Sequence, residues 1–287
     1  MLMEYPTRVR TLPAPMPTMA GAQRSATRPV PAQPDTARLL GRFAPISLVH
    51  MDGVALQDRI DTKHVLHVDH LYSALASLTE HYRILEIDGV RLHRYQTLYF
   101  DTADFALYRQ HHAGRRNRYK VRNRHYLDTG LSCLEVKLKT KGDRTIKRRP
   151  RTPEIVTELT PETCAFLAEH LPPDTPGLEP QLWNNFARIT LVSTRRQERL
   201  TLDVDLRFTG GDTVLLPGIA VAEVKQAGRG CSSDFVRVMR GSHIRSTGFS
   251  KYCLGVSLLY PDVKHNNSKA HQRLLRKLVQ GGSRDPR

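Results

Sequence analysis

The sequence predicts an α+β fold: an antiparallel sheet or closed barrel with helices at its rim. Two observations predict it. Segments in which apolar residues occur at every second position are numerous between residues 57 and 226. Few helical segments separate them, whereas a doubly wound parallel sheet would need a helix between successive strands.

The strand-like segments follow one another along the middle of the chain. They occupy residues 57–69, 94–102, 116–126, 134–139, 144–149, 186–192, 198–208 and 219–226. Turn residues separate some of them, notably Asp128-Thr129-Gly130 and Gly142-Asp143. These turns favour antiparallel hairpins in the middle of the sheet.

Helical spacing and capping residues predict the helices. Asp69 can cap a helix that carries leucines at 71, 75 and 78, and Thr160-Pro161 starts a helix that ends near Leu171. A short helix is expected at 233–239. A basic amphipathic helix is expected at 268–280.

The chain divides into three parts by composition. Residues 1–42 form a leader that we expect to be disordered, because its first 40 residues contain seven prolines and five arginines with little apolar periodicity. Residues 43–262 form the folded domain. Residues 263–287 form a basic tail, for which we expect a helix on the protein surface. Binding to an anionic membrane surface is the alternative for this tail.

The charge is large and concentrated. The net charge is +16 with a pI near 10.0, and residues 91–149 hold 16 Lys or Arg against 5 Asp or Glu. Such an excess indicates a polyanionic partner: nucleic acid, an anionic membrane or a phosphate-rich small molecule.

Several predicted strands carry their charges on one face, because alternate side chains of a strand point the same way. The rows are Arg118, Lys120, Arg122 and Arg124; Glu135, Lys137 and Lys139; Arg199, Thr201, Asp203 and Asp205; and Glu223 with Lys225. Any one row alone is most simply the solvated side of a half-buried sheet. Neighbouring rows of like charge destabilise a sheet, so together they predict an inward-facing basic tunnel that a polyanion fills.

Residue chemistry narrows the ligand to phosphates. Arginine binds phosphate oxygens in a bidentate way, and lysine acts as a point charge. Glu223 and Glu135 would repel a polyphosphate unless Mg²⁺ or Mn²⁺ lay between them. We therefore expect a Mn²⁺ or Mg²⁺ cofactor held by Glu223, with Glu135 as a further candidate.

Other site types lack their sequence signals. No phosphate-binding loop and no dinucleotide fingerprint occurs, and the basic segments lack the interleaved aromatic residues of single-strand nucleic-acid binders. Histidine-metal sites at His64, His67 and His70 or at His111-His112 are disfavoured by extended or loop-like surroundings. The four cysteines contain no C-x-x-C pair.

The chain has no apolar run of the roughly 20 residues that span a bilayer and no apolar signal core. A cytoplasmic protein is therefore expected.

Taken in order, the motifs resemble a known family. They are RIDTKHVL, YFDT, YKVRNRHY, LEVKLKTKGDRTIKR, FARI, ERLTLDVDL, VAEVK and FSKYCLG. Over residues 43–262 they are similar to the VTC domain, the polyphosphate polymerase domain of the vacuolar transporter chaperone, in the CYTH or triphosphate tunnel metalloenzyme superfamily. The resemblance implies a closed eight-stranded antiparallel barrel. Inside it, ATP and a divalent metal would extend inorganic polyphosphate.

The resemblance also implies roles for individual residues. The phosphate-binding set it implies is Lys63, Arg122, Arg124, Lys137, Lys147, Arg188, Arg199 and Lys251. Within this set, Lys63, Arg122, Arg124 and Lys251 are the expected catalytic residues, and Glu223 is the expected metal ligand.

One departure bears on the reaction. Tunnel hydrolases usually open with E-x-E-x-K, and this chain has Arg59-Ile-Asp61-Thr-Lys63. The loss of the first acid favours a polymerase over a hydrolase. A triphosphatase or tripolyphosphatase, a non-catalytic polyphosphate-binding module and a general nucleic-acid binder remain the alternatives.

Overall fold

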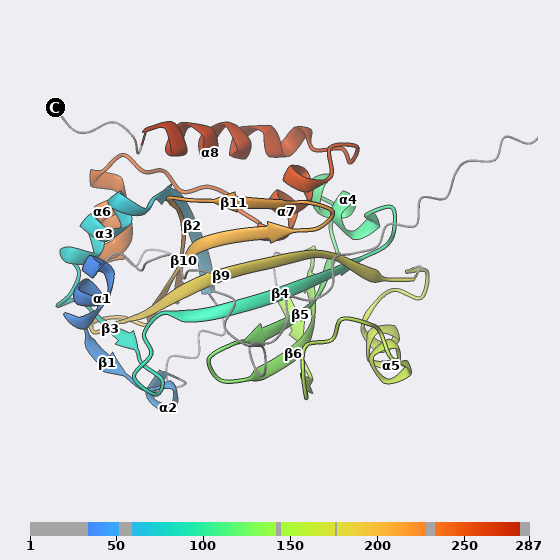
Figure 1. The fold of residues 1–287 in the computed structure, drawn as a ribbon, viewed down its shortest axis with the longest axis horizontal. Helices are drawn as coiled ribbons and strands as arrows, with labels where there is room; N and C mark the ends of the chain where they lie inside the picture. The colour runs from blue at the N-terminus through green and yellow to red at the C-terminus, as the bar shows by residue number, and fades with distance from the viewer. Residues whose placement is uncertain (1–33, 52–58, 142–144, 176, 228–232, 282–287) are drawn as a thin grey trace, which may run out of the picture.

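The computed structural model describes residues 34–51, 59–141, 145–175, 177–227 and 233–281. Its strands form one 12-stranded sheet (Figure 1). The main path runs β2 (Arg59–His67), β12 (Ile219–Ala227), β10 (Glu198–Thr209), β9 (Glu179–Ser193), β4 (His93–Asp101), β5 (Arg118–Tyr126), β6 (Leu131–Lys139) and β7 (Thr145–Arg148). Every pairing along this path is antiparallel, as the sequence predicted.

Four short strands extend the sheet beside this path. They are β1 (Ala44–Ile46), β3 (Tyr82–Leu85), β8 (Arg151–Thr152) and β11 (Thr213–Leu216). β1 pairs with β3 in parallel, β3 pairs with β9, β8 with β6, and β11 with β10. The long strands β9 and β10 therefore lie at the centre of the sheet and connect its two halves.

The sheet curls into an open half-barrel, so the expectation of a closed eight-stranded barrel is wrong (Figure 1). Within the part of the chain that the structure describes, β2 and β7 are the two ends of the path and do not pair. β7 has only four residues, all exposed. On the other side, the segment before α7 (Lys251–Leu259) lies along β2, and the Thr247 amide donates to the Lys63 carbonyl at 2.8 Å. The edge of β2 that would pair with β7 in a closed barrel is therefore hydrogen-bonded to this segment.

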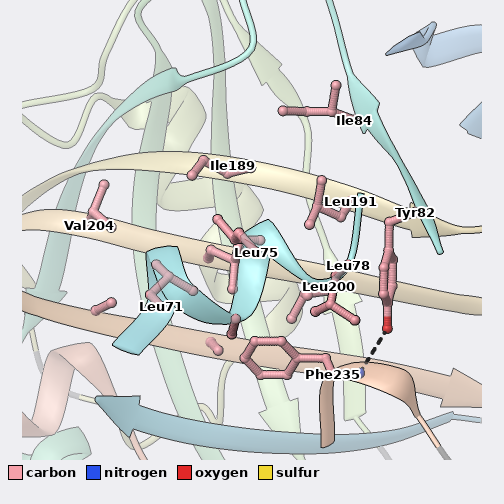
Figure 2. Close-up of a cluster of buried hydrophobic side chains, with 14 of the residues drawn as sticks. Leu71, Leu75, Leu78, Tyr82, Ile84, Ile189, Leu191, Leu200, Val204 and Phe235 are labelled. Carbon is pink, nitrogen blue, oxygen red and sulfur yellow. Dashed lines mark hydrogen bonds between the residues drawn. The ribbon is translucent and has the colours of Figure 1, made fainter. Parts of the chain in front are cut away.

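The larger core lies on the outer face of β2, β12, β10 and β9. It is covered by α1 (Pro34–Gly41), α3 (Val68–Ala76) and α6 (Asp234–Gly241). Figure 2 shows Leu71, Leu75 and Leu78 directed at the leucines and valine of β9 and β10, with Phe235 and Tyr82 closing the cluster. The leucine spacing predicted from the sequence therefore marks the buried side of α3.

A second outer cluster covers the other half of the sheet. The helix α5 (Pro161–His170) packs Leu167 near Leu98, Leu134 and Trp183. Thr160 caps α5 by accepting from the Thr163 amide, and Pro161 occupies the first turn, as predicted. Both halves of the outer face are therefore apolar, and the charged rows lie on the inner face, part of which forms a further apolar cluster with α7.

Helix α7 lies against the inner face of the sheet. Its close approach requires Gly255, because a Cβ there would lie 2.6 Å from Leu182 Cδ2 and 2.7 Å from Phe208 Cδ1. Its neighbours are α4 (Ala106–His112) and α8 (Lys269–Gly281), which follows the 3₁₀ turn η2 (Asn266–Ser268). A four-residue helix, α2 (Leu48–Met51), follows β1.

A β-bulge in β10 changes which residues face inward. One extra residue lies between Val204 and Arg207, and Asp205 adopts a φ of +55° there. Leu202 and Val204 therefore pack in the outer core, while Leu206 packs with α7 on the other side. Asp205 is exposed and leaves the row that contains Asp203, contrary to the simple alternation expected from the sequence.

Two helix starts differ from expectation. His67 caps α3 by accepting from the Asp69 amide at 3.3 Å, so Asp69 lies in the first turn, where its charge still complements the helix dipole. At the N-terminal side, α1 occupies the end of the segment expected to be a leader, and its Leu40 is buried.

The tail helix α8 uses its apolar side within the protein. Leu275 is buried, and Leu274 and Leu278 pack against the cluster around α7. Its exposed cations are Lys269, Arg273, Arg276 and Lys277. In this position α8 can approach an anionic surface through charge but cannot insert its leucines. Among the described helices, none combines the length and apolar character that crossing a bilayer requires.

Candidate functional site

The inner face carries charged residues that the strand register aligns across neighbouring strands. Lys63 of β2 lies opposite Glu223 of β12, which lies opposite Thr201 of β10. Asp203 of β10 lies opposite Arg188 of β9. The alternation seen in the sequence therefore becomes one continuous charged surface, here called the inner basic face.

The first group on this face is centred on Asp203, which is 3% exposed. Its carboxylate accepts from Arg188 Nε at 2.5 Å and Nη2 at 2.9 Å, and it also pairs with the ammonium of Lys251 at the start of α7. Burial alone would raise the pKa of Asp203, but Arg188 and Lys251 outweigh it and lower the pKa to about 2. Asp203 is therefore ionised and fully engaged.

The second group is centred on Glu135, whose side chain is 1% exposed. It accepts from Arg122 Nε at 2.5 Å and pairs with Lys147 of β7. Burial opposes ionisation of Glu135, but Arg122, Arg124 and Lys147 hold its pKa well below the usual range. Through this carboxylate, the short β7 contributes a cation to the inner basic face.

The third group is centred on Glu223. Lys63 Nζ donates to its Oε1 at 3.2 Å, and Lys225 pairs with the same oxygen. Asp61 lies within hydrogen-bonding contact of Glu223. Despite burial, Lys225 and Lys63 hold the pKa of Glu223 well below its ordinary value.

The three groups share one design. Each carboxylate contacts two cations, so the Asp203 and Glu135 groups each keep a net charge of about +1, while Asp61 adds a second carboxyl group beside Glu223. The groups also affect one another, since Arg188 is influenced by Glu223, and Lys137 by Glu223 and Lys63. The inner basic face is therefore a single electrostatic unit with an excess of positive charge.

Three further cations on this face form no direct ion pair with a carboxylate among the described residues. Arg124 is 8% exposed, with Nε 3.4 Å from Thr97 Oγ1, and Lys120 donates to Ser250 Oγ at 2.8 Å. Lys137 opens into a cavity. Burial, together with Arg122 and Lys120, lowers the pKa of Lys137 to about 8. These side chains can therefore bind an anion without breaking a direct ion pair with a carboxylate.

Aromatic rings support the cations. The rings of Tyr95 and Phe186 stack at 5.1 Å, and the guanidinium of Arg188 lies 5.0 Å from the Tyr95 centroid. Arg124 lies 5.5 Å from the same ring, and Lys251 lies 4.7 Å from the ring of Phe186. Such cation–π contacts fix the direction of the side chains while leaving their N–H groups available.

A cavity of about 440 Å³ lies where the half-barrel is open. Its basic lining is Lys63, Arg118, Lys120, Lys137 and Lys139. The rest of its wall comes from Asp61, the end of α4, the segment 247–250, η2 and the first turns of α7 and α8. This cavity gives an anion access from solvent to the inner basic face.

The acidic residues allow a test of the expected metal. Asp61 and Glu223 place two carboxyl groups in contact, which suits Mg²⁺ or Mn²⁺ bound by one or two carboxylates together with phosphate oxygens. No group of three His, Cys, Asp or Glu that could hold a metal occurs in the described residues. The chain therefore fits a metal that arrives with a phosphate ligand. Glu223 also contacts two cations, but it has Asp61 beside it, so it fits this role better than Glu135, whose described contacts are with Arg122 and Lys147.

The structure places most of the predicted residues together. The residues that lie in the three groups are Lys63, Arg122, Lys147, Arg188, Lys251, Glu135 and Glu223. Arg124 and Lys137 lie among them. Arg199 lies opposite Lys225 on the same face, farther from Asp203 along β10.

Sequence reasoning missed three members of these groups, Asp203, Lys225 and Asp61, and one neighbouring donor, Lys120. Asp203 and Lys225 were visible as members of charged rows, but nothing in one strand shows that each shares an ion pair across strands. Lys120 lay in the basic row of β5, and its donation to Ser250 depends on the position of α7.

Comparisons with known proteins address the family. A search of curated proteins gave no match. Among solved structures, the putative adenylyl cyclase HpAC1 from Hippeastrum, described as having a dominant triphosphatase activity, is 14% identical, with a TM-score of 0.40 over 69% of this chain and 96% of that one. PH1819 protein from Pyrococcus horikoshii OT3 is 11% identical, with a TM-score of 0.40 over 71% of this chain and 99% of that one. Neither likeness establishes a shared function at these values.

The family model gives a direct assignment. The model of the VTC domain matches residues 58–260, which include every strand of the inner basic face and the start of α7. The chain belongs to the VTC domain family.

Proposed function

We propose that this protein is a metal-dependent phosphotransferase that moves the terminal phosphate of ATP to an inorganic polyphosphate chain on the inner basic face. The observation that carries the proposal is the set of three carboxylates that each hold two cations on one face of the sheet, beside a solvent-connected cavity that Lys63, Lys120 and Lys137 line. Membership of the VTC domain family supports the choice of polyphosphate as the anion.

The state of the acids favours transfer over hydrolysis. A hydrolase must activate water, and a carboxylate that does so needs a pKa near the working pH and a free oxygen. Glu135, Asp203 and Glu223 have strongly lowered pKa values and are engaged by cations. The terminal phosphate of a polyphosphate chain is already anionic, so it can attack without a general base.

The cations supply what phosphoryl transfer requires, namely alignment and charge neutralisation. The guanidinium groups of Arg122, Arg124 and Arg188 are suited to hold phosphate oxygens in fixed directions, and Arg199 would extend this row. The lysines, which are Lys63, Lys137, Lys147 and Lys251, would neutralise charge as it shifts from donor to acceptor. A metal bound by Glu223 and Asp61 would supply further neutralisation at the phosphates.

The test is to incubate purified protein with ATP and Mn²⁺ and to size the phosphate products. We expect ADP and long polyphosphate. If the products are orthophosphate without longer chains, the protein is a hydrolase and the polymerase proposal is refuted. Tight tripolyphosphate binding without turnover in Mn²⁺, Mg²⁺ or Co²⁺ would identify a binding module. DNA or RNA binding that short polyphosphates compete only weakly would indicate a nucleic-acid protein.

Matched variants connect the activity to the inner basic face. Lys147→Gln removes a cation from this face, whereas Arg148→Gln removes the neighbouring exposed cation, which alternation directs to the other side of β7. We expect chain synthesis to fall at least about tenfold in the first and to change little in the second. Glu223→Gln should weaken metal dependence, and an active variant with unchanged dependence would refute the metal assignment.

A further inference from the structure

A buried carboxylate outside the three charged groups connects α4 to α7. Asp101, at the end of β4, is fully buried. It accepts hydrogen bonds at 2.8 Å from the amides of Thr102, Leu107 and Tyr108, and it also accepts one from the hydroxyl of Tyr252. Asp101 thus joins the first turn of α4 to the first turn of α7.

Tyr252 stands between this carboxylate and the inner basic face. It follows Lys251, the residue that pairs with Asp203, so the two share one turn of helix. Its ring stacks on Tyr99 at 4.8 Å with an interplanar angle of 28°. Tyr99 in turn hydrogen-bonds to Arg122. Tyr252 therefore contacts both the Asp203 group and the Glu135 group through one intermediate each.

The surroundings of Tyr99 show how close these groups are. Burial raises the pKa of the Tyr99 phenol, but the nearby cations Arg122, Arg124, Lys120 and Lys251 outweigh it and lower the pKa. A small movement of α7 would therefore change the spacing of cations that the proposed reaction uses together.

We propose that Asp101 and Tyr252 form a positioning pair that fixes the first turn of α7, so that Lys251 and Arg122 face the same phosphates. Neither residue touches the ligand. The hydrogen bond between Asp101 and Tyr252 fixes the turn of α7 that carries Lys251. The ring of Tyr252 keeps Tyr99 in contact with Arg122. This inference rests on the proposed function, because it assigns the pair to the geometry of that site.

The decisive variant is Tyr252→Phe, which removes the hydroxyl and keeps the ring. Tripolyphosphate is the probe, and its Kd is measured by calorimetry on the full chain. We expect binding to weaken about tenfold, which is the scale for losing a hydrogen bond to a charged group. Asp101→Asn should weaken it by a similar factor, and the double variant should be no worse than either single one.

A double-mutant cycle distinguishes positioning from a general loss of stability. In a Lys251→Gln background, Tyr252→Phe should lose most of its effect on Kd, because its main route to the ligand is gone. A merely structural role predicts the same loss in both backgrounds. Tyr108→Phe is the matched control: Tyr108 is buried next to Tyr252, but its hydroxyl donates to the Lys264 carbonyl, away from the charged groups. It should lower stability without changing Kd.

The outcomes separate this inference from the proposed function. Wild-type protein that fails to bind tripolyphosphate overturns both. Wild-type binding with unchanged Kd in Tyr252→Phe, or equal losses in both backgrounds of the cycle, overturns the positioning pair alone. If Tyr252→Phe is unfolded at the assay temperature, Asp101→Asn decides by the same two criteria.

Discussion

Replacing Asp203 by asparagine removes a buried negative charge and keeps the shape of the side chain. In the wild type this carboxylate accepts two hydrogen bonds from Arg188 and pairs with Lys251. In the variant both cations remain buried and face a neutral amide. The two positive charges then repel each other without a counterion, and this repulsion lowers the free energy of unfolding.

The contacts set the size of the effect. Removing one partner of a buried ion pair costs about 3–5 kcal/mol, because the remaining charge is left uncompensated. Asparagine keeps one acceptor oxygen, so we expect a loss at the low end, about 3 kcal/mol. With about 2–4 °C of melting temperature per kcal/mol, the variant should melt roughly 6–12 °C below the wild type.

Thermal and urea unfolding at neutral pH measure this loss, and a second aspartate on the same strand is the control. Asp205→Asn changes an exposed carboxylate at the bulge, where asparagine tolerates the φ of +55°. We expect the control to stay within about 0.5 kcal/mol of the wild type. An Asp203→Asn protein as stable as the control would refute the idea that Asp203 compensates two buried cations.

The pH dependence gives an independent check with a defined sign. The pKa of Asp203 is lowered to about 2, against about 3.9 for an ordinary aspartate. Its contribution to stability is therefore present above about pH 4 and is lost as the pH falls towards 2. The stability difference between wild type and Asp203→Asn should shrink over that window. A difference that stays constant there would contradict the assignment.

Two further predictions follow from single residues. Lys137 has a pKa of about 8, so its positive charge is lost as the pH rises through 8, and tripolyphosphate should bind more weakly at pH 9 than at pH 7. Titrating the Kd from pH 7 to 9 tests this: Lys137→Gln should reduce the pH slope of the Kd but not remove it, because Lys147 also has a pKa of about 8, and equal slopes in both proteins would contradict the prediction. In α7, Gly255→Ala should cost about 1–3 kcal/mol in urea unfolding, because the new Cβ would overlap Leu182 and Phe208. An unchanged midpoint would show that α7 can move away from the sheet.

The sequence predicted the sheet strands well because one face of each is buried and the other is charged. The row of Arg122 and Arg124 on β5 and the pair Glu135 and Lys137 on β6 could be identified from alternation alone. Alternation reports the face of a strand relative to its neighbours. It therefore found the inner basic face before any strand pairing was known.

The same reasoning failed where structure depends on distant segments. Closure of the barrel depends on whether β7 can reach β2, and the Thr247 amide occupies that edge at Lys63. The bulge at Asp205 reverses the alternation within β10, and no residue type in the segment predicts a bulge. The ion-pair partners were also hidden, because Arg188 and Asp203 come from different strands and Lys251 from a helix.

The shared design of the three groups resolves a conflict between folding and binding. A surface of bare cations would attract polyphosphate strongly, but its self-repulsion would oppose the folded state while it is empty. A carboxylate that lies between two cations removes much of that repulsion and holds each guanidinium or ammonium in a fixed direction. The ligand then meets donors that are already oriented, so less of the binding free energy is spent on ordering side chains. By this reasoning, removing the carboxylate of Asp203 should lower the stability of the empty protein more than that of the ligand-bound protein. Bound phosphate supplies the missing negative charge to Arg188 and Lys251.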